Sequence, residues 1–93
     1  MTNKVYKVYD DELELVYGET QIREFAVSQV WNCPDDFIKE NIFQTEEKDV
    51  DRLVKLAERI SSNENFDVKD LTMKDVRLIL NERCFDIEEL DIY

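Results

Sequence analysis

Carboxylates are the side chains of this sequence that offer the most chemistry, since 23 of its 93 residues are Asp or Glu. Two carboxylates can serve as general acid and general base when their environments push their pKa values apart. The adjacent candidates are Asp10/Asp11, Asp35/Asp36, Glu46/Glu47 and Glu88/Glu89. At this density such pairs arise by chance, and turns, helix starts and solvated faces explain them better than catalysis does. We therefore predict that the protein is not an enzyme.

Other reactive side chains complete no recognisable site. The chain has no histidine, so a serine or cysteine nucleophile lacks its usual base, and Cys33 and Cys84 are too far apart for a zinc motif. Residues 63–67 alternate like EF-hand ligands, but the positions that require Gly and Glu hold Val68 and Lys74. We predict no metal and no cofactor, and we expect both cysteines to be reduced, small buried residues.

The net charge of −11 is the most informative property of the composition. Such a chain repels phosphate backbones, so we expect no direct binding to nucleic acid. A helix-turn-helix interpretation of residues 20–43 fails because Lys39 is the single base of its second helix. Solubility alone is one explanation of the charge. The other is a partner with a basic surface, whose complementary charge would speed association.

Acidic residues near the two ends of the chain are the best candidates for such contacts, because residues 48–59 interleave four bases with their acids. The predicted partner-binding residues are Asp10, Asp11, Glu12, Glu14, Glu88, Glu89 and Asp91.

The elements that must position these residues begin with a β-hairpin over residues 4–17. Two β-rich runs flank the acidic turn 10–12, and Leu13, Leu15 and Tyr17 alternate with Glu12 and Glu14 at the period of a strand. An isolated hairpin is marginally stable. We therefore favour a third strand with a bulge over residues 84–93, and a helical turn over 88–90 is the alternative.

Helices are expected between the hairpin and this tail. Thr20 is placed to cap the first, and Pro34 to open a second that extends to Phe43. Thr45 is the expected start of the third, whose apolar stripe is Val50, Leu53, Val54, Ala57 and Ile60. Thr72 and Asp75 predict a capping arrangement for a last helix that ends near Arg83.

The chain is predicted to be one α+β domain, residues 1–93, with an N-terminal hairpin packed on three or four short helices. No run approaches the roughly 20 apolar residues that span a membrane, and no signal peptide is apparent. We expect a cytoplasmic protein with no membrane contact.

The segments 4–10 (KVYKVYD) and 15–20 (LVYGET), with the size and acidity of the chain, resemble small accessory proteins of bacteriophages and mobile elements. The amino-acid composition, which favours Lys, Asn, Ile and Glu, resembles that of proteins from a low-GC bacterial host. The resemblance implies a protein that binds and disables one host factor, and anti-CRISPR proteins form one such group. These groups share no motif, so no functional residue is transferred from them.

The leading hypothesis is a non-enzymatic acidic module that inhibits a host nucleic-acid-binding protein by mimicking nucleic acid. The alternative is a structural or assembly protein, a small homo-oligomer that associates through an apolar patch around Trp31, Phe37 and Phe43.

Overall fold

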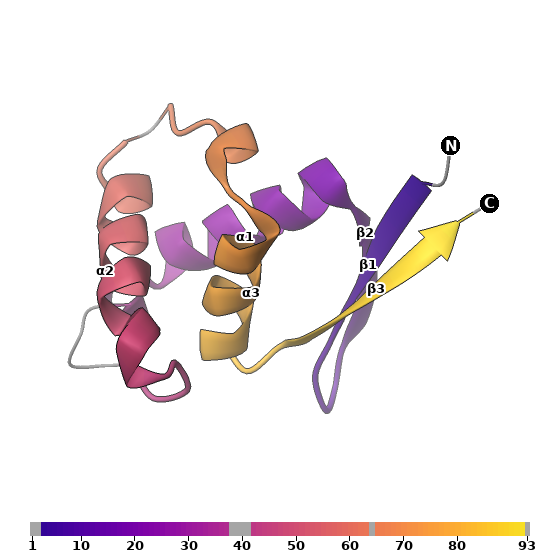
Figure 1. Ribbon diagram of the computed structural model, residues 1–93, viewed down its shortest axis with the longest axis horizontal. Coiled ribbons are helices and arrows are strands. Elements are labelled where there is room, and N and C mark those ends of the chain that lie inside the picture. The colour runs from indigo at the N-terminus through magenta and orange to yellow at the C-terminus, as the bar shows by residue number, and fades with distance from the viewer. Residues whose placement is uncertain (1–2, 38–41, 64, 93) are drawn as a thin grey trace.

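A computed structural model describes residues 3–37, 42–63 and 65–92 and confirms the α+β class (Figure 1). Strands β1 (Asn3–Tyr9) and β2 (Glu14–Gly18) form the predicted hairpin. Their antiparallel register sets Val5 opposite Gly18 and Tyr9 opposite Glu14.

The C-terminal tail forms a third strand, β3 (Asp86–Ile92), which pairs antiparallel with β1 and gives the sheet order β2-β1-β3. The predicted strand is confirmed, and the alternative helical turn is wrong. The predicted bulge is also wrong, because the register runs unbroken from Tyr9 opposite Asp86 to Asn3 opposite Ile92. Ile87 and Leu90 are three positions apart and lie on opposite faces of one regular strand, so the spacing of the apolar residues needs no bulge.

This register predicts unequal costs for two similar substitutions. Ile87 lies opposite Val8 and packs against the core, whereas Leu90 lies opposite Val5 on the face that no helix covers. Ile87→Ser should lower the free energy of unfolding by about 2 kcal/mol, and Leu90→Ser by about 0.5 kcal/mol. Urea titrations followed by circular dichroism measure both, and the reverse order would indicate a one-residue slip of β3.

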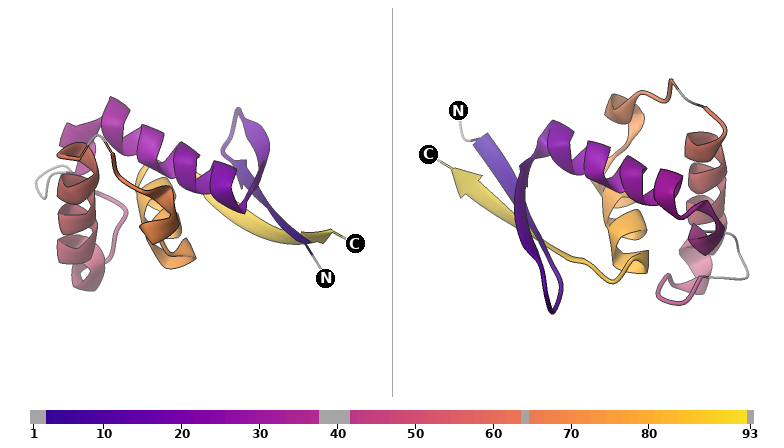
Figure 2. Two further views of the ribbon diagram at one scale, coloured as in Figure 1. Left: turned by 90° about the horizontal axis from the view of Figure 1, so that it is seen from above. Right: turned by 180° about the vertical axis from the view of Figure 1, so that it is seen from behind.

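Helices cover one face of the sheet and leave the other open (Figure 2). α1 (Glu19–Asn32) and α3 (Met73–Glu82) lie next to the strands, and α2 (Glu47–Ser61) lies at the end of the molecule away from the sheet (Figure 1). The sheet contributes Tyr6 and Val8 to the core. The helices add Ile22, Ala26, Val30, Leu53, Ala57, Ile60, Val76, Ile79 and Leu80.

α1 starts one residue before the predicted cap, Thr20. Gly18 is the N-cap, and its backbone N–H donates to Oε1 of Gln21 at 3.0 Å. Because Gln21 satisfies this N–H from inside the first turn, Thr20 falls within the helix and caps nothing.

The expected helix at Pro34 is a single 3-10 turn, η1 (Pro34–Phe37), in the described part of the chain. Its expected continuation through Ile38 falls on residues 38–41, outside the described residues, and residues 42–46 are not helical. α2 has Glu46 rather than Thr45 as its N-cap. The Thr45 hydroxyl instead donates to Glu82 at 2.8 Å, so it is not available to cap.

α3 begins as predicted. Oγ1 of Thr72 accepts from the backbone N–H of Asp75 at 3.1 Å, and Oδ2 of Asp75 accepts from the N–H of Thr72 at 3.4 Å. A 3-10 turn that the sequence did not suggest, η3 (Val68–Asp70), precedes it. Cys84 follows the helix with a φ of 67°, the left-handed position that usually ends helices.

Candidate functional site

The structure distributes the predicted acidic residues over three parts of the sheet. Asp10, Asp11 and Glu12 form the hairpin turn, and Glu14 opens β2. The other three lie in β3 and alternate between faces: Glu88 opposite Lys7 on the open face, Glu89 opposite Tyr6 and Asp91 opposite Lys4 on the helix-facing side. No single flat face therefore holds all seven.

β3 nevertheless gathers more acid than the sequence interpretation assigned to it. Asp86, which that interpretation missed, opens the strand on the open face, opposite Tyr9 at the end of β1. Its position two residues before Glu88 was the available signal, since alternate residues of a strand share a face. We call Asp86, Glu88, Glu89 and Asp91 of β3, with Asp11 and Glu12 of the adjoining turn, the acidic track. All six side chains are exposed.

Two lysines of β1 form ion pairs with acids of this track and partly neutralise it on the side that faces β1. The Nζ atom of Lys7 lies 3.3 Å from Glu88 and 3.7 Å from Glu14, and that of Lys4 lies 3.4 Å from Glu89. The hydrogen bond and charge of Glu88 raise the pKa of Lys7 above its ordinary 10.5, with a smaller effect of Glu14. The charge of Glu89, and to a smaller extent its hydrogen bond, raise the pKa of Lys4. Carboxylates thus outnumber their basic partners along the track.

These ion pairs predict a pH dependence confined to alkaline solution. Because folding raises the pKa of Lys7, its ammonium stabilises the fold below pH 10.5, and this contribution is lost as the pH rises through the raised value. Glu88→Gln should lower the pKa of Lys7 more than Glu14→Gln does, because the hydrogen bond is with Glu88. Titration of the Lys7 side chain by NMR measures both shifts, and equal shifts would contradict the assignment.

Asp10 has a structural task within the turn. Its Oδ1 atom accepts from the backbone N–H groups of Glu12 at 2.8 Å and Leu13 at 2.7 Å, and its own N–H donates to the carbonyl of Leu13 at 2.9 Å. Such self-bonded aspartates fix tight turns. The Asp10 carboxylate therefore holds the turn that presents Asp11 and Glu12.

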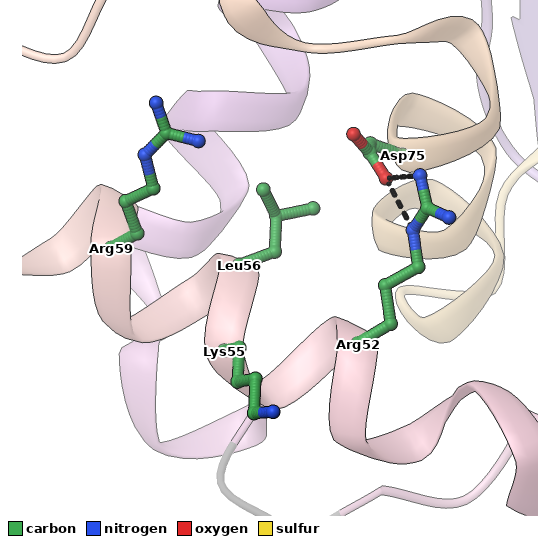
Figure 3. A pocket seen from close by; sticks show the side chains of 5 residues that line it. All are labelled: Arg52, Lys55, Leu56, Arg59 and Asp75. Carbon is green, nitrogen blue, oxygen red and sulfur yellow. Dashed lines mark hydrogen bonds and ion pairs between the residues drawn. The ribbon is translucent and has the colours of Figure 1, made fainter.

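Positive charge gathers at the other end of the molecule, on α2. Arg52, Lys55 and Arg59 project from this helix around Leu56 and line a groove of about 440 Å³ (Figure 3). Arg52 turns into the groove toward Asp75 of α3, as Figure 3 shows, with its Nη2 atom 2.7 Å from the carboxylate. The side of α2 that lines this groove is therefore basic rather than acidic.

The apolar patch expected for self-association is not formed. Phe37 is only 1% exposed and belongs to the core, which contradicts its assignment to a surface. Trp31 and Phe43 are 50% and 82% exposed, but they lie near opposite ends of α2. Trp31 donates from Nε1 to the carbonyl of Ile60 at 3.2 Å, and Phe43 precedes the first turn.

Among the described residues, no group of three or more acidic or cysteine side chains is arranged to hold a metal ion. Cys33 and Cys84 are both free thiols, but the expectation that both are buried is wrong. Cys33 is half-buried and Cys84 is exposed, because the left-handed turn after α3 carries it to the surface.

Comparison of the chain with protein-family models, with curated proteins and with solved structures finds no match. In the described part of the chain, no helix has both the length and the apolar character needed to cross a bilayer.

Proposed function

We propose that the protein is a non-enzymatic binding module that docks its acidic track on the basic, nucleic-acid-binding surface of a bacterial host protein. The observation that carries this proposal is the concentration of Asp86, Glu88, Glu89 and Asp91 in one seven-residue strand at the edge of the sheet. The adjoining turn extends this charge with Asp11 and Glu12.

Electrostatics favours this use of the track. DNA carries one negative charge per roughly 1.7 Å of duplex, so a groove built for it presents dense Lys and Arg. A rigid strand with exposed carboxylates at alternate positions about 7 Å apart offers such a groove fixed anions in place of phosphates. The ordered sheet lowers the entropic cost of presenting them. Occupying the groove would inhibit the host protein, as an accessory protein of a phage or mobile element, such as an anti-CRISPR protein, would do in the cytoplasm.

The test compares two variants with equal changes in net charge. Glu12→Lys, Asp86→Lys and Asp91→Lys reverse exposed acids of the track, and Glu24→Lys, Glu47→Lys and Glu58→Lys reverse exposed acids of α1 and α2. Each tagged protein is used to capture partners from nuclease-treated host lysate at low and high salt, with mass spectrometry as the readout.

We expect the wild type and the helix variant to retain a nucleic-acid-binding protein at low salt and release it at high salt. The track variant should lose at least about 100-fold in affinity for the captured protein. Equal retention by both variants, or a partner that does not bind nucleic acid, would overturn the proposal.

A further inference from the structure

β3 has an outer edge that is open as well as acidic. The sheet order β2-β1-β3 leaves β3 paired on its β1 side only, and no backbone hydrogen bond in the described residues engages its other edge. An edge of this kind presents alternating N–H and C=O groups to any strand that can pair with it. Recognition by strand addition uses these main-chain groups for affinity and the flanking side chains for specificity.

The side chains of β3 determine which strands can pair there. Residues opposite each other in neighbouring strands lie about 5 Å apart, so opposite charges attract and like charges repel. Asp86 and Glu88 project to one face of the sheet, and Glu89 and Asp91 project to the other. Acidic side chains therefore flank the edge of β3 on both faces. A second copy of β3 would place acids against acids, which disfavours self-pairing at this edge.

The inner side of β3 already shows the kind of strand that it accepts. β1 contributes Lys7 directly opposite Glu88, with their charged atoms 3.3 Å apart, and Lys4, which reaches Glu89 at 3.4 Å. Between these lysines, Val5 lies opposite Leu90. β1 thus sets a lysine opposite two of the four acids and a valine opposite each aliphatic residue of β3, while Tyr6 and Tyr9 lie opposite the other two acids.

We propose that β3 binds an extended basic segment of the partner protein as a fourth strand of the sheet. Pairing with residues 86–91 requires the order basic, aliphatic, basic, basic, aliphatic, basic, with the aliphatic residues opposite Ile87 and Leu90. This inference rests on the proposed function and adds the geometry and sequence pattern of the bound segment.

The direct test uses the synthetic peptide Lys-Val-Lys-Lys-Val-Lys and the full chain, observed by amide hydrogen exchange and NMR titration. We expect alternate amides of β3 to become protected, namely those that point away from β1, with little change in β2. A peptide of the same sequence with N-methyl groups at the pairing positions keeps its charge but cannot donate. It should bind at least about 10-fold more weakly, because the main-chain hydrogen bonds supply the affinity.

A charge exchange tests the side-chain pattern. The Asp86→Lys, Asp91→Lys variant should reject the basic peptide and bind Glu-Val-Lys-Lys-Val-Glu, which places acids opposite both new lysines. Equal binding of the N-methylated peptide, or protection outside β3, would overturn strand addition. If the track variant still loses the lysate partner in that case, the proposed function survives without it. If strand addition is overturned and the track variant also retains the lysate partner as well as the wild type does, both the strand addition and the proposed function are wrong.

Discussion

Replacement of Glu82 with alanine is expected to lower the free energy of unfolding by about 3 kcal/mol. This carboxylate is 7% exposed and accepts four hydrogen bonds from the segment that leads into α2. The donors are the backbone N–H groups of Phe43, Gln44 and Thr45, at 2.6 to 3.0 Å, and the Thr45 hydroxyl at 2.8 Å. Removing it leaves these donors unsatisfied and frees the segment from the end of α3.

The control is Glu58→Ala, since Glu58 also lies in the last turn of a helix but is exposed. Acids near a helix C-terminus oppose the helix dipole, so neither carboxylate is favourable for its own helix. Glu58→Ala should change stability by no more than about 0.5 kcal/mol, and Glu82→Gln should cost less than Glu82→Ala because its amide oxygen still accepts. Urea titrations measure all three, and equal effects of the two alanine variants would show that Glu82 holds nothing.

Local patterns were sufficient to predict the hairpin and the last helix. The hairpin follows from period-two alternation, and the cap of α3 from two residues only three apart, Thr72 and Asp75. β3 followed from the instability of a lone hairpin. The helix starts predicted at Thr20 and Thr45 were wrong because a capping residue is recognised by its type, whereas its neighbours decide whether it caps. Gln21 accepts from the backbone N–H of Gly18, and Glu82 accepts from the Thr45 hydroxyl.

The acidic site could be predicted in composition but not in arrangement. Glu88 and Glu89 are adjacent in sequence and point to opposite faces of one strand, a consequence of the strand assignment itself. The same reasoning would have added Asp86. Which strand occupies the edge of the sheet, and which face the helices cover, depends on contacts between distant segments. Local periodicity carries no information about them.

Long-range polar contacts were not predictable for the same reason. Glu82 binds residues 37 to 39 positions away, and Arg52 reaches Asp75 across 23 positions. The sequence identified Asp75 only as part of a cap, and nothing in it indicated the ion pair of Asp75 with Arg52 or the burial of Glu82.

Asp75→Ala is expected to cost about 3 kcal/mol, because this side chain performs two tasks at the start of α3. It completes the cap with Thr72, and its Oδ1 atom accepts from both Nε and Nη2 of Arg52, at 2.8 and 2.7 Å (Figure 3). The residue is only 8% exposed, whereas the Arg52 side chain is 45% exposed, so losing Asp75 removes both the cap and the ion pair and leaves the guanidinium to solvent. Asp75→Asn should cost less, since the amide oxygen still accepts.

A double-mutant cycle separates the two tasks of Asp75. Substituting Arg52 and Asp75 singly and together should give a coupling energy of about 1 kcal/mol, with the rest of the Asp75 effect due to the cap. The matched control is Arg59 with Asp70, 3.3 Å apart, where both side chains are more than half exposed. Solvent screens that pair, so its coupling should stay below about 0.5 kcal/mol. Equal coupling in the two cycles would mean that burial of Asp75 adds nothing to the ion pair, and the cost of Asp75→Ala would then belong to the cap alone.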